Sequence, residues 1–405
     1  MTYSALDDIT VLDLSDRLAG SFCAKTLSLY GCDVIKIEPI GGDITRNWES
    51  GNPKNSSDSP LFLHLNSGKK SMTLNLEHIM AISILKALIK KSDVLIETFK
   101  PEKLASIGLS YHEIKSINPN IILTSITPYG QTGPYRFYEY DELTVFAMTG
   151  AMHREGLPER YPVRYGGETS QYFAGNTAAS ATTAALFKRL LHGGGEWIDI
   201  SIQECMAGHP HQIGRRAPFI YAGDIDKRVS PRTSATGDRE PYAVGTFKCK
   251  DGYFSFLPLG PRMWPNIAKM INREDLLINP RYDIPAKRTD LRKELEDIFQ
   301  NWLNQYTRSE IFDFVQKAGI PGSPILRSDE VLSNTQFVDR GFFQTVTQPN
   351  GMILKMTGEP FRLTGLPKLD TLPAPETGEH TKEILKNILQ MSESDVENLY
   401  KESVI

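Results

Sequence analysis

The feature that most constrains the fold is a strand–helix–strand pattern near the beginning of the chain. Residues 9–15, ITVLDLS, and residues 32–39, CDVIKIEP, are apolar, β-branched runs of strand length. Between them, residues 17–31 carry apolar side chains at helical spacing and end on Gly31, a residue that commonly follows the last turn of a helix. Strands joined in this way run parallel in one sheet, with a right-handed crossover. The pattern therefore predicts a parallel sheet.

The same pattern recurs further along the chain. Strand-like residues 70–76, helix-like residues 77–91 and strand-like residues 92–99 are followed by a short helical stretch, 111–117, and another strand, 120–126. Residues 192–204 give a glycine turn and a further strand. This alternation predicts an α/β fold with helices covering a mostly parallel, Rossmann-like sheet. The first turn of that sheet reads SDRLAG, which lacks the G-x-G-x-x-G pattern that cradles a dinucleotide. The sequence therefore argues against an NAD site.

Composition argues against several classes of partner. The formal net charge of −4 provides no basic stripe for nucleic acid and no polybasic anchor for a membrane. The longest apolar run, residues 79–89, is broken by Lys86 and is too short to span a bilayer. The first residues have no signal-peptide pattern, and the 4 cysteines have no CxxC pairing and no histidine at metal-ligand spacing. We expect a cytoplasmic protein that has no metal site and binds neither nucleic acid nor a membrane.

The chain of 405 residues is long enough for more than one domain. Residues 1–213 contain the alternating pattern and are predicted to form an α/β domain. Residues 214–245 are rich in Arg, Pro, Ser and Gly without periodicity, which predicts a connector. Residues 246–340 combine a hairpin pattern around Asp251-Gly252 with amphipathic helical patterns, so we expect a smaller α+β domain there.

Residues 166–189, GGETSQYFAGNTAASATTAALFKR, join a glycine-flanked turn to a helical pattern with almost no bulky side chains. We expect a helix over about residues 172–191, with Thr169 or Ser170 as its N-cap. Glu168 and Gln171 are the polar side chains at its start. An acid near a helix N-terminus is stabilised by the helix dipole, so Glu168 has a structural interpretation beside any chemical one.

Motifs along the whole chain resemble those of the family III CoA-transferases. They occur in the order typical of that family: residues 11–46 (VLDLSDRLAGSFCAKTLSLYGCDVIKIEPIGGDITR), 66–76 (NSGKKSMTLNL), 92–111 (SDVLIETFKPEKLASIGLSY), 118–135 (NPNIILTSITPYGQTGPY), 140–150 (YDELTVFAMTG), 193–204 (GGGEWIDISIQE), 318–325 (AGIPGSPI), 339–343 (DRGFF) and 373–381 (PAPETGEHT). The resemblance implies a large Rossmann-like domain built from both ends of the chain, which residues 341–405 complete. It also implies an interlocked dimer of two subunits threaded through each other.

The resemblance implies a covalent mechanism. In the family, a carboxylate attacks an acyl-CoA thioester, forms a mixed anhydride and releases CoA thiolate. The thiolate re-attacks to give an enzyme-bound thioester, from which an acceptor acid collects the CoA. The nucleophile is an aspartate four residues before a glycine at the start of the small-residue helix, and counting back from Gly175 reaches Gln171. A neutral carboxamide cannot form the anhydride, so this chain departs from the family at its nucleophile.

Several interpretations of this departure remain open. Glu168 is the nearest alternative carboxylate, although Gly166 and Gly167 indicate that it still lies in the turn. Gln171 is interpreted either as a hydrogen-bonding structural residue or as a residue that lines the acyl-CoA pocket without covalent work. In a further interpretation the chain is the partner of a related chain that carries the aspartate, as in family members assembled from two chains.

The CoA-binding residues are also implied by the resemblance. Arg17, Leu18 and Ala19 occupy the first strand-to-helix turn, where the family's backbone meets CoA and where a helix N-terminus suits an anionic group. Lys69 and Lys70 follow a glycine and form a reasonable pair for a nucleotide phosphate.

Thr98 and Phe99 replace the family's Asn-Phe pair, with Phe99 available to stack on adenine. CoA thioesters and carboxylic acids are the expected substrates, and no tightly bound cofactor is expected. Two hypotheses follow for the whole chain. It is either a CoA-transferase, alone or within a homodimer or heterodimer, or a catalytically silent partner that supplies fold and interface.

Overall fold

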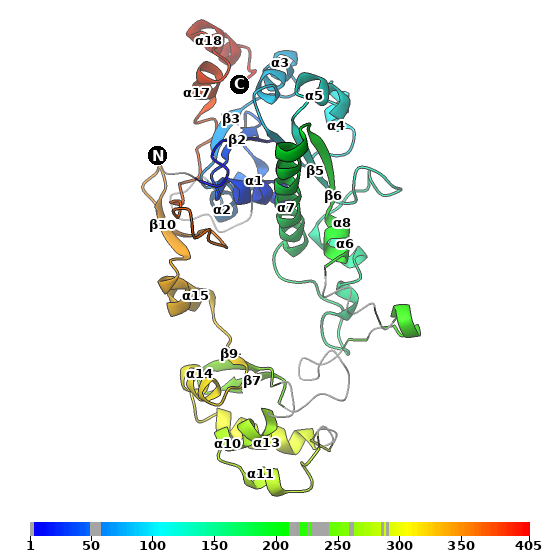
Figure 1. The fold of residues 1–405 in the computed structure, drawn as a ribbon, viewed down its shortest axis with the longest axis vertical. Helices are drawn as coiled ribbons and strands as arrows, with labels where there is room; N and C mark the ends of the chain where they lie inside the picture. Colours follow the sequence, from blue (N-terminus) through cyan, green and yellow to red (C-terminus); the bar gives the residue numbers. More distant parts are fainter. Residues whose placement is uncertain are drawn as a thin grey trace. The chain divides into compact units, whose positions relative to one another are not determined.

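The computed structural model of the chain describes residues 4–48, 58–209, 217, 219–225, 227–228, 243–258, 263–284, 287–288 and 291–405. It divides into two compact units (Figure 1). The first comprises Met1–Ala151, Arg164–Ala217 and Asn334–Ile405, and the second comprises Met152–Val163 and Pro218–Ser333. The second unit thus includes a segment, Met152–Val163, that the predicted boundaries place in the first domain. Most of the predicted connector, residues 214–245, lies outside the described residues.

A six-stranded parallel sheet with the order β3-β2-β1-β4-β5-β6 forms the centre of the first unit. The predicted strands are confirmed, as β1 (Thr10–Asp13), β2 (Asp33–Glu38), β3 (Lys70–Thr73), β4 (Val94–Glu97), β5 (Ile122–Thr127) and β6 (Glu196–Ser201). The strand order reverses between β1 and β4. In sheets of this kind a crevice opens at that point, beyond the carboxyl ends of the strands, and ligands bind there.

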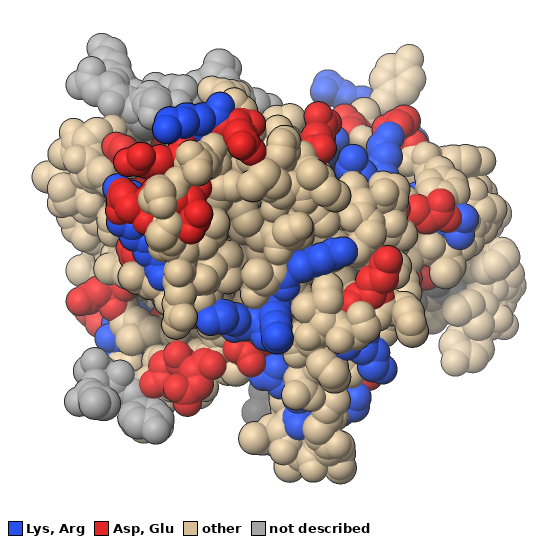
Figure 2. Space-filling view, turned by 90° about the horizontal axis from the view of Figure 1, so that it is seen from above, with Lys and Arg blue, Asp and Glu red and all other residues tan. Residues whose placement is uncertain are grey.

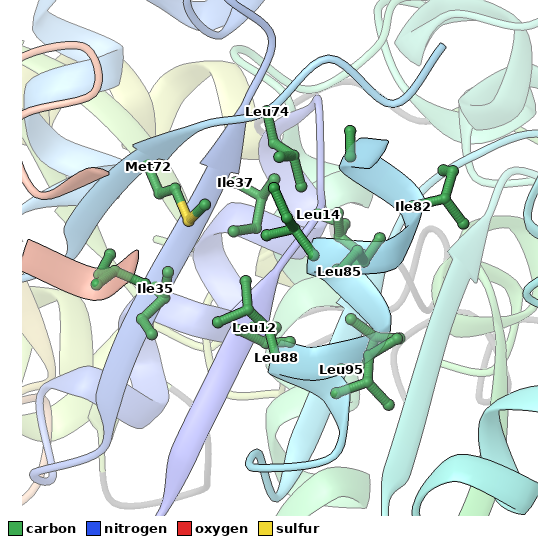
Figure 3. Close-up of a cluster of buried hydrophobic side chains, with 14 of the residues drawn as sticks. Leu12, Leu14, Ile35, Ile37, Met72, Leu74, Ile82, Leu85, Leu88 and Leu95 are labelled. Carbon is green, nitrogen blue, oxygen red and sulfur yellow. The ribbon is translucent and has the colours of Figure 1, made fainter. Parts of the chain in front are cut away.

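Helices cover both faces of this sheet. On one face, the strand residues Val11, Val34 and Ile96 share a buried cluster with side chains of α1 (Leu18–Ser28) and α7 (Thr169–His192). On the other face, Leu12 and Leu95 pack with Leu85 and Leu88 of α3 (Ile79–Ile89), as Figure 3 shows. The same cluster contains side chains of α5 (Tyr111–Ile117), α17 (Thr381–Asn387) and α18 (Glu393–Lys401). The C-terminal helices therefore pack in the core built by the N-terminal strands.

The remaining elements of the first unit are α1 (Leu18–Ser28), η1 (Ile44–Asn47), α2 (Pro60–Asn66), α3 (Ile79–Ile89), α4 (Lys103–Ser106), α5 (Tyr111–Ile117), α6 (Glu142–Met148), α7 (Thr169–His192), α8 (Ile202–Ala207), α16 (Thr335–Asp339), α17 (Thr381–Asn387), α18 (Glu393–Lys401) and the antiparallel pair β10 (Phe343–Thr347) and β11 (Ile353–Thr357). Helix α7 packs along α1, and its small side chains permit that approach. A Cβ added at Gly175 would lie 2.5 Å from the carbonyl oxygen of Ala19.

The second unit is a smaller α+β structure. Its elements are η2 (Met152–Arg154), β7 (Gly245–Cys249), β8 (Gly252–Phe256), α10 (Met263–Met270), α11 (Asp275–Ile278), α13 (Arg292–Leu303), α14 (Arg308–Lys317), β9 (Gly322–Pro324) and α15 (Ser328–Ser333). Strands β7, β8 and β9 form an antiparallel sheet over an aromatic core that includes Phe254 and Phe299. The predicted hairpin is present, but Cys249 pairs with Gly252, so the turn is Lys250-Asp251 and Gly252 already belongs to the strand.

Two further observations concern the described residues as a whole. None of their helices combines the length and apolar character needed to cross a membrane. They also contain no group of three or more His, Cys, Asp or Glu side chains placed to hold a metal ion. Acidic and basic side chains both occur across the face of the molecule drawn in Figure 2.

Candidate active site

The turn between β1 and α1 leaves the N-terminus of α1 without a side-chain cap. Arg17 is the N-cap residue of α1, with extended backbone angles of φ −140° and ψ −177°, and no side chain caps the helix there. Leu18 and Ala19 are the first helical residues, as the sequence predicts. The first amides of a helix have no partner within the helix and carry its positive end, so this turn suits an anionic group.

Thr98 comes to the same place from β4. Its hydroxyl donates to the Asp16 carboxylate at 2.7 Å and accepts from the Asp16 amide at 3.1 Å, so it ties the end of β4 to the turn before α1. The Phe99 amide donates to the Glu97 carboxylate at 2.7 Å. The Phe99 ring is only partly buried and packs against the core. The structure thus brings Arg17, Leu18, Ala19, Thr98 and Phe99 to the carboxyl edges of the two central strands.

The predicted lysine pair does not join this group. Lys69 is buried, and its ammonium donates to Asp13 at 2.8 Å, to the Ser21 carbonyl at 2.9 Å and to Asn66 at 2.9 Å. These bonds use all the donors of a lysine, so the ammonium has none left for a phosphate. Lys70 begins β3 and pairs with Asp33, which begins β2, at 3.0 Å. In a parallel sheet these residues mark the amino edge, opposite the crevice, so the prediction of one phosphate site formed by both lysines does not fit the structure.

Gln171 lies in the first turn of α7, and its side chain is buried, with 3% of the residue exposed. The helix begins at Thr169, three residues before its predicted start. Glu168 is the N-cap residue and still belongs to the turn, but its side chain caps no amide of the helix. The prediction of Thr169 or Ser170 as the N-cap is wrong, because both residues are already helical. The carboxamide of Gln171 donates to the Glu168 carboxylate at 3.2 Å.

A second carboxylate, which the sequence did not identify, faces this helix start. Glu142 is buried, with 6% exposed, and its Oε1 accepts from the Ser170 amide at 2.9 Å. Glu142 Oε2, Ser170 Oγ and Gln171 Oε1 are also buried, and none of the three has a hydrogen-bond partner among the described residues. Burial, together with the nearby charge of Glu142, raises the pKa of Glu168. The start of α7 therefore contains two acids, a carboxamide and unsatisfied polar atoms.

The α7 group and the turn before α1 adjoin each other. The Arg17 guanidinium lies over the Tyr140 ring, 4.8 Å from its centroid, and burial raises the pKa of Tyr140 to about 12. Glu142 follows Tyr140 by two residues and reaches α7, while Gly175 of α7 meets Ala19 of α1. This region of the first unit thus combines an uncapped helix N-terminus, a basic side chain and two carboxylates.

The spacing of apolar residues in α6 could have identified Glu142 as a buried acid from the sequence. Asp141 is the N-cap of α6, since its carboxylate accepts from the amides of Leu143 at 2.9 Å and Thr144 at 3.3 Å. Glu142, Val145 and Phe146 then share the buried face of the helix. An acid at a position of the apolar stripe is unusual, because a buried carboxylate needs a partner.

Comparisons with known proteins identify the family of the chain. A family model described as CoA-transferase family III matches residues 6–381. Succinyl-CoA:glutarate CoA-transferase of Mus musculus is 31% identical over 401 residues, which are 99% of this chain and 90% of that protein. The beta subunit of succinyl-CoA–L-malate CoA-transferase of Chloroflexus aurantiacus is 29% identical over 412 residues, 99% of this chain and 98% of that subunit.

A solved structure shows the same likeness. The crystal structure of a CAIB/BAIF family protein from Brucella suis has a TM-score of 0.85 and 27% sequence identity, and the match covers 96% of this chain and 100% of that one. The family model, the full-length relatives and the fold lead to one conclusion: the chain belongs to CoA-transferase family III.

Proposed function

We propose that this chain moves CoA between an acyl-CoA and a carboxylic acid, with the reacting thioester at the start of α7. The observation that carries the proposal is the presence of two carboxylates at the start of α7, near the uncapped N-terminus of α1: Glu168 accepts from the Gln171 carboxamide, and Glu142 accepts from the Ser170 amide. The helix N-terminus and Arg17 supply the positive field that CoA phosphates require. The carboxylates supply the chemistry that CoA transfer requires.

Glu168 is the acid that the proposal assigns to the acyl group when the chain acts alone. Its carboxylate attacks the thioester carbonyl, the carbon–sulfur bond breaks, and an acyl-glutamyl anhydride and CoA thiolate form. The thiolate then attacks the glutamyl carbonyl, which releases the donor acid and leaves a glutamyl-CoA thioester. An acceptor carboxylate reverses these steps and leaves as its own CoA thioester.

The surroundings of Glu168 support this assignment. Burial beside Glu142 raises its pKa, so its carboxylate is less stabilised by water and more basic than a free glutamate. The Gln171 carboxamide donates to Glu168 Oε2 and so orients the group without competing as a nucleophile. Glu142 is the less suitable acid, because it is buried, with 6% exposed, whereas Glu168 is only partly buried.

A second candidate function is that of a non-catalytic subunit paired with a related, aspartate-bearing chain. It is favoured by the carboxamide at Gln171 and by the full-length likeness to a relative that is itself named a beta subunit. In such an assembly this chain supplies fold, interface and part of the CoA site.

Hydroxylamine trapping during turnover with succinyl-CoA as the probe separates the two functions. A covalent adduct on Glu168, found by mass spectrometry and lost in Glu168→Gln, supports the self-sufficient enzyme. Glu77→Gln, at an exposed acid before α3, is the matched control and keeps the adduct. Activity that appears only with a second chain, and no adduct on this one, supports the subunit. A chain that neither transfers CoA nor binds it in either setting contradicts both.

A further inference from the structure

Beneath the turn that presents Arg17 lies a lysine that has no access to the crevice. Lys36, in the middle of β2, is fully buried, with 0% of its side chain exposed. Its ammonium forms an ion pair with Asp43 at 2.7 Å and lies 4.0 Å from Asp13. It also donates to the carbonyl oxygen of Ser15.

We propose that Lys36 is a positioning residue that holds the β1–α1 turn, and through it Arg17 and the free amides of α1, in the geometry that binds CoA. The choice of CoA as the ligand rests on the proposed function. The contacts of Lys36 with the turn do not depend on it.

The contacts around Ser15 show how the turn is held. Lys36 binds its carbonyl, while Asp13 accepts from its amide at 3.0 Å and from its hydroxyl. Lys69 holds Asp13 at 2.8 Å and also donates to the carbonyl of Ser21 in α1, at 2.9 Å. Every polar group of Ser15 is therefore bonded to a buried charged side chain, and Lys69, which holds Asp13, is bonded in turn to the first turns of the helix.

Packing leaves this turn little room to relax. A Cβ added at Gly20 would collide with Ser15 Cβ and Thr98 Cγ2, so the residues before α1, the first turn of α1 and the end of β4 are in close contact. Asp16, which binds Thr98, and Arg17 follow Ser15 directly. A shift of the Ser15 carbonyl is thus transmitted to both sides of the crevice.

The chemistry of these contacts indicates that Lys36 positions the turn rather than stabilises the fold. Replacing a buried ion pair by apolar side chains is often neutral or stabilising, because each charge loses its hydration when buried. An ammonium, however, offers directed donors at the end of a long side chain, which an apolar residue cannot replace. Backbone amides bind an anion only when they are held close to the right positions. Loss of the hydrogen bond from Lys36 to the Ser15 carbonyl should therefore weaken CoA binding.

The test compares wild type with Lys36→Met and with Lys36→Met/Asp43→Asn. The double variant removes both partners of the ion pair, so no unpaired carboxylate is left to unfold the domain. Lys188→Met, which removes an ion pair with Glu196 at the amino edge of the same sheet, is the matched control. Two quantities are measured: amide hydrogen exchange over residues 14–20, and the Kd for CoA by calorimetry.

We expect exchange over residues 14–20 to accelerate, and the Kd for CoA to rise, each by at least about tenfold in the folded double variant. The control should change neither. A folded double variant with unchanged exchange, or with faster exchange and an unchanged Kd, overturns the proposal. If wild type binds no CoA, the proposed function fails on that ground, and the exchange measurement alone still decides whether Lys36 positions the turn.

Discussion

Among single residues, the raised pKa of Glu97 predicts how the stability of the first unit depends on pH. It is buried, with 4% exposed, and burial raises its pKa to about 7, against hydrogen bonds from Ser125 and the Phe99 amide. Asp16 and Asp199 raise it further. The folded state therefore binds the Glu97 proton more tightly than the unfolded state, so this residue lowers stability as pH rises from about 4.5 to about 7.

Glu97→Gln should remove this pH dependence, because the amide oxygen still accepts from Phe99 and does not titrate. We expect the variant to gain up to about 3 kcal/mol relative to wild type between pH 4.5 and pH 8, measured as the free energy of unfolding in urea. Glu77→Gln, at an exposed acid before α3, should leave the wild-type profile unchanged. A Glu97→Gln profile parallel to that of wild type would show that Glu97 stays ionised throughout.

A carboxylate introduced at position 171 tests whether this position corresponds to that of the family nucleophile. Gln171→Asp should place a covalent adduct at position 171 during turnover with succinyl-CoA, because the side chain lies at the buried start of α7 beside the proposed acyl site. Hydroxylamine trapping and mass spectrometry locate the adduct. Gln171→Asn is the control, because asparagine has the size of aspartate but no carboxylate. It should carry no adduct at position 171. An active Gln171→Asp protein without an adduct at this position would contradict the correspondence.

Among the elements, α7 depends on its small residues for its approach to α1. Glycine within a helix is ordinarily destabilising by about 1 kcal/mol relative to alanine. Gly175→Ala should nevertheless destabilise the protein by about 1–3 kcal/mol, because the new methyl group would press on the Ala19 carbonyl. The free energy of unfolding measures this directly.

Gly166→Ala is the matched control, since nothing lies within 4 Å of a Cβ at that position. It should change stability by less than about 0.5 kcal/mol. The displacement of α1 in Gly175→Ala should also weaken CoA binding, because Ala19 and Arg17 belong to the same turn of that helix. Equal stability of the two variants would mean that α7 and α1 do not meet as closely as described.

For the whole molecule, the last turns of α7 predict self-association. Phe187, Leu190 and Leu191 are 59%, 80% and 58% exposed, which leaves apolar side chains in water at one end of this long helix. Exposed apolar patches of this kind commonly mark protein interfaces. We expect light scattering to give about twice the mass of one chain, as for a dimer with one closed interface.

Leu190→Glu/Leu191→Glu should lower that mass or weaken association, because it places charges where apolar contact is expected. Ile79→Glu is the control: Ile79 is 76% exposed, but it begins α3 on the other face of the sheet. A monomeric wild type at micromolar concentration would contradict the prediction of a dimer. A heterodimer would appear as a homogeneous dimer only after a related chain is added.

Patterns in the sequence were enough to predict the sheet, its parallel strands and the family resemblance. Strand and helix patterns depend on residues that are neighbours in the chain, so β1 to β6, α1 and α7 could all be predicted from local periodicity. The position of Arg17, Leu18 and Ala19 followed in the same way, because it depends only on where β1 ends and α1 begins.

Which polar groups contact each other could be seen only in the folded chain. Lys69 pairs with Asp13, which is 56 residues away, and Glu142 binds the amide of Ser170, 28 residues away. No local pattern records such pairings, so Lys69 was assigned to a phosphate and Glu142 was not identified. The physical reason is that periodicity reports which face of an element is apolar, whereas the partner of a buried charge is set by the elements that pack against it.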